Sequence, residues 1–320
     1  MERTVLVTGA TGFVGGHLLD LIAADAVDIV GWRRAGAGEA LPAGYPEGGR
    51  VTWRDVDVAD PRSVREAVQA CAPSDVYHLA GASHVGQAWE RTADALATNV
   101  LGTHHLLEAL RHVVPAARIL LPCTALAYRQ TLDPITEDSA VGPNNPYALS
   151  KLAQEMLGLR AWRDDGQAVI VARSFNHVGP GQSPLFFASS FARQVAEIEA
   201  GRAEPVIHVG NLDAERDLTD VRDTVRAYRA LVTSGRPGGV YNVCSGRAYR
   251  VSDILAQLVA RARVPVEVRI DPTRLRPNDN PRVLGDPRRI QQETGWTPAI
   301  PIERTLDDVL DDWRRRVAAR

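Results

Sequence analysis

A regular alternation between short apolar runs and longer amphipathic segments is the feature that most constrains the fold of this chain. The apolar runs are too short for helices and predict buried strands at residues 4–7, 28–32, 75–79, 118–121 and 168–172. The segments between them carry apolar residues at helical spacing and predict helices at 14–23, 61–71, 92–111 and 147–162. Strands and helices that alternate at this spacing form βαβ units, which predicts a parallel sheet with right-handed crossovers.

The second half of the chain is less regular, because proline- and glycine-rich breaks at 179–184, 235–239 and 271–281 separate shorter elements. Residues 240–243 followed by 251–262 resemble one more strand–helix unit that returns to the sheet. We therefore expect an α/β fold: a doubly wound parallel sheet of the Rossmann type, with a smaller, interleaved C-terminal substrate domain. The boundaries predicted from these breaks are 1–175 with 218–262 for the dinucleotide-binding domain, and 176–217 with 263–320 for the substrate domain.

Composition excludes several classes of protein. The 320 residues carry a formal net charge of −2, so no basic field indicates a nucleic-acid partner. Three cysteines without a CxxC motif do not suggest a disulfide frame or a zinc site, and the adjacent His104 and His105 cannot share one helical face, so we expect no metal. The N-terminus lacks the pattern of a signal peptide, and no apolar run approaches membrane-spanning length. We expect a soluble cytoplasmic protein without a membrane partner.

Glycines mark the turn between the first strand and the first helix. Gly9, Gly12 and Gly15 lack side chains where a pyrophosphate would approach the backbone, and the helix N-terminus offers free N–H groups and partial positive charge. The end of the second strand then distinguishes NAD(H) from NADP(H). Arg33 and Arg34 stand there without a carboxylate, which favours NADP(H), because a guanidinium matches phosphate geometry.

A tyrosine and a lysine four residues apart suggest acid–base chemistry. Tyr147 and Lys151 share one face of a predicted helix, where the lysine charge would lower the tyrosine pKa for proton transfer to an alkoxide. Lys151 is also the only lysine among 37 lysine and arginine residues. Thr124 follows the strand at 118–121, at the sheet edge where ligands bind, and its hydroxyl is placed to bond the same substrate oxygen. A threonine that merely satisfies backbone groups would show the same pattern.

Together these motifs resemble the extended short-chain dehydrogenases/reductases, and the likeness covers almost the whole chain. The glycine turn, Asp57, His78-Leu79-Ala80-Gly81, Asn99 with Gly102-Thr103, Thr124 and the tyrosine–lysine pair carry it. Segments 173–182, 210–223, 241–246 and 271–277 are similar to enzymes that act on GDP-linked hexoses, with GDP-4-keto-6-deoxy-D-mannose reductases as the nearest group and GDP-mannose 4,6-dehydratases as their relatives.

The resemblance implies a role for several further residues. Asn99 joins Thr124, Tyr147 and Lys151 as a catalytic residue whose backbone positions the lysine through water. Asp57 would accept the adenine amino group, although a solvated aspartate would give the same pattern. Tyr147 and Lys151 are also expected at the cofactor, where Lys151 would bind the nicotinamide ribose. The other residues expected there are Thr11, Phe13, Val14, Val58, Leu79, Ala80 and His177. The residues expected at the substrate, besides Thr124, are Ser83, Asn176, Arg193, Arg216 and Arg276.

One position separates reductases from dehydratases. The residue two beyond the threonine, which is glutamate in the dehydratases, is Leu126, and leucine cannot carry a proton for elimination. The expected reaction is therefore NADPH-dependent reduction of a 4-keto-6-deoxyhexose on GDP, giving GDP-D-rhamnose. Arg129 and Ser83-His84 depart from the reductase pattern, which suggests a loop shaped around a different sugar. A 4-epimerase or a dehydratase-like enzyme stays open because such enzymes share the catalytic residues, and a non-catalytic NADP-binding module is a remote alternative. By resemblance we also expect a homodimer or a dimer of dimers, paired through the helices at 92–111 and 147–162.

Overall fold

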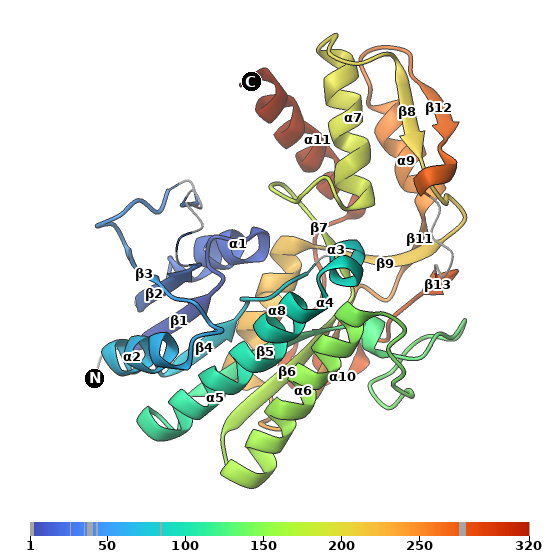
Figure 1. Ribbon diagram of the computed structural model, residues 1–320. Coiled ribbons are helices and arrows are strands. Elements are labelled where there is room, and N and C mark those ends of the chain that lie inside the picture. Colours follow the sequence, from blue (N-terminus) through green and yellow to red (C-terminus); the bar gives the residue numbers. More distant parts are fainter. Residues whose placement is uncertain are drawn as a thin grey trace.

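A seven-stranded parallel sheet organises the larger part of the computed structural model, which describes residues 3–25, 27–34, 36, 41–42, 44–83, 85–274 and 280–319. Its strand order is β10-β6-β5-β4-β1-β2-β3. The chain adds β2 and β3 on one side of β1 and then crosses to the other side of β1, where it adds β4 and the later strands (Figure 1). The strands are β1 (Thr4–Thr8), β2 (Asp28–Arg33), β3 (Val51–Asp55), β4 (Asp75–His78), β5 (Arg118–Thr124), β6 (Ala168–Ser174) and β10 (Val240–Val243). The predicted doubly wound sheet is confirmed, and its switch point is where such folds bind ligands.

Helices cover both faces of this sheet. On one face lie α1 (Phe13–Ile22), α8 (Val221–Ser234) and α10 (Arg288–Thr294), and on the other lie α2 (Pro61–Cys71), α5 (Gly102–Val113) and α6 (Pro146–Asp165). Each face has its own buried apolar cluster. Two helices begin as the sequence suggests, because the side chains of Asp60 and Asn145 cap α2 and α6, and a proline follows each cap.

The predicted helix at 92–111 is interrupted. After the short α3 (Val85–Glu90), the chain forms α4 (Thr92–Leu96), a π-helical turn (Ala97–Leu101) and then α5. The hydroxyl of Thr103, in the first turn of α5, donates to the carbonyl oxygen of Asn99 at 2.7 Å, so a side chain bonds to the backbone of the π turn. The widened turn puts Asn99 in the wall of the site described below.

A smaller part of the molecule lies beyond the carboxyl ends of the main strands, at the top of Figure 1. It contains β7 (Asn176–Val178), β8 (Val206–Val209), β9 (Glu215–Asp220), β11 (Ala248–Arg250), β12 (Glu267–Ile270) and β13 (Arg282–Val283). Its helices are α7 (Phe187–Glu199), α9 (Val251–Ala260) and α11 (Ile302–Ala318), which share a separate buried cluster. Short 3-10 turns occur at Ala125–Ala127 and Pro272–Arg274.

The strand–helix unit predicted at 240–262 is only half correct. β10 returns to the main sheet beside β6, as predicted, but α9 packs Ile254 and Leu258 into the cluster of α7 and α11. The cause is β11, which pairs antiparallel with β9 and carries the chain out of the main sheet before α9 begins. α9 therefore contributes to the core of the smaller part.

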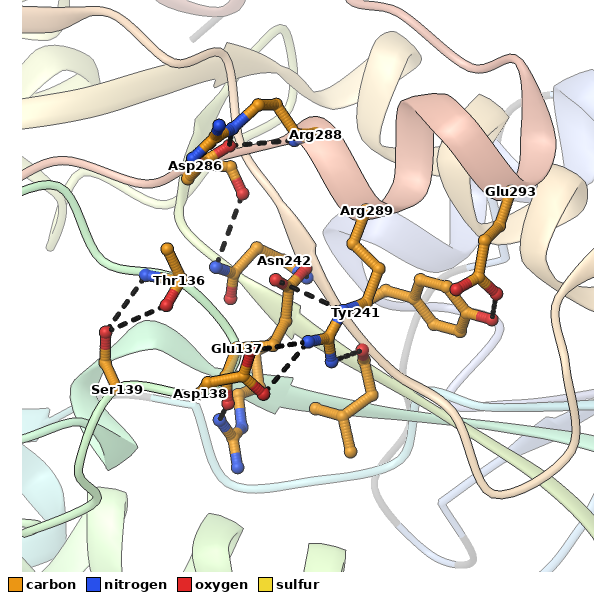
Figure 2. Close-up of polar contacts among 12 residues, drawn as sticks. Thr136, Glu137, Asp138, Ser139, Tyr241, Asn242, Asp286, Arg288, Arg289 and Glu293 are labelled. Atoms are coloured by element: carbon orange, nitrogen blue, oxygen red, sulfur yellow. Dashed lines mark hydrogen bonds and ion pairs between the residues drawn. The ribbon is translucent and has the colours of Figure 1, made fainter.

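A polar cluster fixes the long segment between β5 and α6. Figure 2 shows Glu137 and Asp138 facing Arg289 of α10, with Asn242 of β10 beside them. The Asn242 backbone N–H donates to Glu137 Oε1 at 2.8 Å, and its side-chain nitrogen donates to the Ile135 carbonyl at 2.9 Å. The hydroxyl of Tyr128 donates to Asn242 Oδ1 at 2.7 Å. These contacts hold the connection between the two residues, Thr124 and Tyr147, that the sequence places in the site.

Candidate active site

The glycine turn between β1 and α1 leaves no room for side chains. Gly9 has a φ of +64°, and a Cβ there would lie 2.7 Å from the backbone nitrogen of Ala80. A Cβ on Gly15 would lie 2.5 Å from the Gly9 carbonyl oxygen. Gly12 is the N-cap of α1 and has no side chain to occupy the first N–H groups of the helix, so these groups can bind an anion. The turn therefore fits the pyrophosphate of a dinucleotide.

The arginines expected at a 2′-phosphate follow the neighbouring strand. β2 lies beside β1, so Arg33 and Arg34 stand at the same sheet edge as the glycine turn. Arg33 is not free, because Nε lies 2.6 Å from an Asp55 carboxylate oxygen and Nη1 lies 2.7 Å from Glu47 Oε1. These two acids raise the pKa of Arg33 and would compete with a phosphate for its N–H groups. The sequence did not reveal the two acids as partners, because they are 14 and 22 residues away.

Asp57 and Val58 follow β3 at this edge. Asp57 is exposed and accepts the Ala59 backbone N–H at 2.9 Å, while Val58 is buried. A methyl group of Val58 would lie 2.9 Å from a Cβ added to Gly102, so the start of α5 packs directly against this segment. Leu79 and Ala80 continue β4 on the other side of the glycine turn, where Leu79 donates its N–H to the Thr8 carbonyl.

Thr124 and Tyr147 are brought together. Thr124 ends β5, and Tyr147 lies in the first turn of α6. The Thr124 hydroxyl oxygen accepts the Leu126 N–H at 3.2 Å, and the hydroxyl lies close enough to the Tyr147 phenol to act on its pKa. A hydroxyl that accepts a backbone proton has its own proton to give, so Thr124 can donate to a ketone oxygen beside Tyr147.

Burial raises the pKa of Tyr147 and the nearby Cys123 adds to this, while the hydrogen bond with Thr124 acts against it. The prediction that Lys151 lowers this pKa is wrong for the protein without its ligands. The ammonium Nζ of Lys151 donates to the side-chain oxygen of Gln154 instead. Burial also lowers the pKa of Lys151 to about 8, so the side chain is only partly protonated near that pH.

Asn99 is fully buried and ties three elements together. Its Nδ2 donates to the Ala82 carbonyl at 3.1 Å and to Ser150 Oγ at 2.9 Å, and its Oδ1 accepts the Ala82 N–H at 2.8 Å. The π turn, the loop after β4 and α6 are thereby locked together next to Lys151. Ser83, expected at the substrate, is exposed in the same loop. Neighbouring His84 lies outside the described residues.

A buried relay beneath the site was not assigned from the sequence. Thr8 Oγ1 accepts the Ala80 N–H at 3.0 Å and lies 2.9 Å from His78 Nδ1, while His78 Nε2 lies 3.0 Å from Thr103 Oγ1. Burial and the charge of Lys151 lower the pKa of His78 to about 3, so its ring is neutral. One consistent proton arrangement results, in which Nε2 donates to Thr103, which in turn donates to Asn99. The motif that contains His78 was the available signal.

The smaller part of the molecule reaches over the glycine turn through residues 177–181. The rings of Phe13 and His177 stack at 6.1 Å, and His17 Nε2 lies 2.8 Å from the Pro180 carbonyl oxygen. Burial lowers the pKa of His177, which favours a neutral ring at neutral pH. Thr11, Phe13 and Val14 thus stand at the start of α1 under this segment.

The residues expected at the substrate lie on separate elements. Asn176 of β7 is exposed and pairs with Leu218 of β9, so its side chain points to the same sheet face as that of Arg216, two residues earlier. Arg216 Nη1 donates to the neighbouring Glu215 carbonyl. Arg193 is on α7, with Nε 3.9 Å from a carboxylate oxygen of Glu197. Arg276 lies outside the described residues.

Within the described ranges, no group of three or more histidine, cysteine, aspartate or glutamate side chains could hold a metal ion. No helix in the same ranges is long and apolar enough to cross a membrane. Cys123 and Cys244 are buried, as expected for small core residues.

Comparisons with known proteins agree with this geometry. Residues 6–309 match the family model described as GDP-mannose 4,6 dehydratase. The chain is 37% identical over 320 residues to a GDP-6-deoxy-D-mannose reductase of Pseudomonas aeruginosa, covering 99% of each chain. It is 28% identical to a dTDP-glucose 4,6-dehydratase of Salmonella typhimurium, covering 96% of this chain and 91% of the relative.

Two solved structures show the same arrangement. The structure of RMD from Pseudomonas aeruginosa complexed with NADPH superposes with a TM-score of 0.86 at 36% identity, covering 98% of this chain and 99% of that one. A Thermus thermophilus UDP-glucose 4-epimerase complexed with NAD gives the same TM-score at 25% identity, with 98% and 99% covered.

Proposed function

This chain belongs to the GDP-mannose 4,6-dehydratase family, and we propose from this that it reduces the C4 ketone of a nucleotide-linked 4-keto-6-deoxyhexose with NADPH. The substrate best supported is GDP-4-keto-6-deoxy-D-mannose, and the product is GDP-D-rhamnose. The observation that carries the proposal is the placement of Thr124, at the end of β5, near Tyr147, in the first turn of α6, in a fold whose glycine turn fits a dinucleotide. The 37% identity to a GDP-6-deoxy-D-mannose reductase over the full chain supports the substrate class.

The chemistry divides among a few side chains. When bound, the reduced nicotinamide supplies a hydride to C4. Tyr147 gives its proton to the ketone oxygen, and Thr124 donates a hydrogen bond to the same oxygen, which stabilises the developing negative charge. When the cofactor and the substrate are bound, the positive charge of Lys151 would act on the phenol and make its proton easier to give, an effect that burial outweighs before they bind. Asn99 holds the wall of the site through Ala82 and Ser150.

The cofactor residues proposed are those at the edge of β1 to β4: the glycine turn with the start of α1, Arg33 and Arg34, Asp57 and Val58, and Leu79 and Ala80. Two arginines at the end of β2 support NADP(H) over NAD(H), as does the P. aeruginosa relative complexed with NADPH. His177 closes this site from the smaller part. Ser83, Asn176, Arg193, Arg216 and Arg276 are proposed for the nucleotide sugar.

Leu126 favours reduction over elimination. Its position, two residues after Thr124, holds an apolar side chain that has no proton to transfer. The experiment is to mix the purified protein with NADPH and GDP-4-keto-6-deoxymannose. We expect oxidation of NADPH and one product, GDP-D-rhamnose, with slower turnover on NADH. The absence of turnover with any 4-keto nucleotide sugar at saturating cofactor would end the proposal, and protein that purifies with tightly held oxidised cofactor would favour an epimerase.

A homodimer is the assembly we propose, with a dimer of dimers as its extension. Leu96, Leu101, Leu149 and Met156 are exposed apolar side chains on α4, the π turn and α6, which pack against one another. A second copy of the chain would cover them. In light scattering, we expect Met156→Glu to give a monomer. Leu132→Glu is the matched control, because Leu132 is equally exposed, at 63%, in the loop after β5. A dimer that survives Met156→Glu would contradict this surface.

The domain division and the location are also proposals. We propose 1–175 with 218–262 as the dinucleotide-binding unit and 176–217 with 263–320 as the substrate unit, with two changes from the packing: α9 (Val251–Ala260) joins the substrate unit and α10 (Arg288–Thr294) joins the dinucleotide-binding unit. A cytoplasmic location fits the three free cysteines, Cys71, Cys123 and Cys244, which a reducing compartment maintains.

A further inference from the structure

Gln154 is a buried side chain of the site that the proposed mechanism does not use. It lies on α6, three residues after Lys151, and is 1% exposed. Its side-chain oxygen accepts a hydrogen bond from the ammonium Nζ of Lys151, which is itself 7% exposed. The ammonium of the only lysine in the chain therefore has a neutral amide as its partner.

The amide nitrogen of Gln154 is left without a comparable interaction. This nitrogen, Nε2, is buried and has no hydrogen-bond partner among the described residues, which is an unfavourable arrangement for a polar group. An apolar side chain of similar size would avoid this cost. The bond that Gln154 does make joins two residues of one helix turn, so it connects no separate elements of the fold. The main effect of this hydrogen bond is therefore on Lys151.

Gln167 shows what a structural glutamine looks like in the same region. It is also 1% exposed and also has one unpartnered atom, its Oε1. Its Nε2, however, donates to the Leu107 carbonyl at 3.1 Å, 60 residues away, and so joins the start of β6 to α5. Gln167 holds elements together, whereas Gln154 holds one charged group.

The surroundings of Lys151 supply no carboxylate that faces it. Among the described residues, β4 contributes His78, which is neutral, and β5 contributes the Cys123 thiol, whose pKa burial raises. Glu155 of α6 is bonded to Arg173 of β6 at 2.6 Å. On α3, α4 and α5 there are acidic and histidine side chains that are exposed or half-exposed, namely Glu90, Asp94, His104 and Glu108. Cys123 of β5 also favours the charged form of Lys151, while the Gln154 amide oxygen is the group that accepts a hydrogen bond from the ammonium.

We propose that Gln154 is a positioning residue of the active site, whose side-chain oxygen keeps Lys151 charged and held in place for the reaction. The role in the reaction rests on the proposed reductase function, but the effect on the lysine does not. Removing the oxygen disfavours the ammonium, so the lysine loses its proton at lower pH. Replacing the amide by a carboxylate favours the ammonium, so the lysine keeps its proton to higher pH.

The single lysine makes a direct test possible. Protein labelled with ¹³C at lysine Cε gives one lysine signal, and its titration reports Lys151 alone, without cofactor or substrate. In the wild type we expect a midpoint near the value of about 8 that burial gives the pKa of Lys151. In Gln154→Met the midpoint falls by about one pH unit, and in Gln154→Glu it rises by a similar amount. Gln167→Met, the matched control, leaves it in place.

The second readout is the pH profile of kcat with saturating NADPH and keto sugar. In Gln154→Met the basic limb moves to lower pH and kcat falls more than the KM for NADPH rises, and Gln154→Glu moves the limb the other way. A midpoint that is unchanged in both Gln154 variants, or that moves equally in Gln167→Met, overturns the proposal. If Gln154→Met does not fold, the sign of the shift in Gln154→Glu decides. If the midpoint moves but no variant turns over substrate, the reductase function fails while the role of Gln154 toward the lysine stands.

Discussion

The corner around Tyr147 and the surface around Arg216 are built in different ways. In the corner, Asn99 and Lys151 each have a buried side-chain partner, and Thr124 accepts a backbone N–H, so these side chains are fixed before any ligand arrives. On the surface, Asn176 and Arg216 lie on neighbouring strands of the smaller part, with Asn176 exposed. A reaction that transfers a proton needs side chains fixed in advance, whereas a diphosphate can be bound by long arginines that adapt. Substitutions in the two regions should therefore affect different kinetic constants.

The largest expected effect is in the corner. Tyr147→Phe removes the proton donor but keeps the ring, so kcat should fall by about 10²- to 10⁴-fold with little change in NADPH affinity. Steady-state rates and fluorescence titration of NADPH check this. Tyr249→Phe, in β11 of the smaller part, is the control and should keep its activity. A Tyr147→Phe protein with near-normal kcat would remove the distinction between the two regions.

The next effect concerns the surface. Arg216→Met removes a proposed diphosphate contact, so KM for the nucleotide sugar should rise by about 10- to 100-fold while kcat changes little. Initial rates over a range of substrate concentration measure the split. Arg250→Met is the matched control, because Arg250 is an exposed arginine on the strand that pairs with β9. If kcat falls instead, Arg216 acts on the reaction itself, and the comparison has to be redrawn.

A smaller effect should appear with pH. Burial lowers the pKa of Lys151 to about 8, and the reaction needs the protonated ammonium. The group is charged below this pKa and neutral above it, so kcat should be level on the acid side and fall about tenfold per pH unit well above it. The binding of the sugar diphosphate should not follow this limb, because arginines stay charged. A kcat that is level up to the range of an exposed lysine, near pH ~10, would contradict the expectation.

The smallest effect is expected at Arg33, because Asp55 and Glu47 already share its N–H groups. Arg33→Met should raise KM for NADPH by about 3- to 10-fold and leave KM for NADH nearly unchanged. Arg54→Met, on the adjacent strand β3, serves as the control. Equal changes with both cofactors would show that Arg33 does not contact the 2′-phosphate.

The features that local patterns determine could be predicted. Strand ends, the glycine turn and the α6 position of Tyr147 and Lys151 follow from residues close together in the chain, and the structure confirms them. Features that depend on distant partners could not. Asn99 in the π turn bonds to Ala82 and Ser150, and α9 leaves the sheet because β11 pairs with β9. The direction predicted for the tyrosine pKa was wrong because the spacing of Tyr147 and Lys151 does not reveal how deeply the phenol is buried, and burial is what raises its pKa.

The central claim, that this chain transfers hydride to C4 of a nucleotide-linked keto sugar, has one direct measurement. NADPH deuterated at nicotinamide C4, on the face that is transferred, is incubated with the protein and GDP-4-keto-6-deoxymannose, and the sugar product is examined by NMR and mass spectrometry. The account predicts one deuterium at sugar C4 for each NADPH oxidised. A product formed without net NADPH oxidation, or without deuterium at C4, would contradict it.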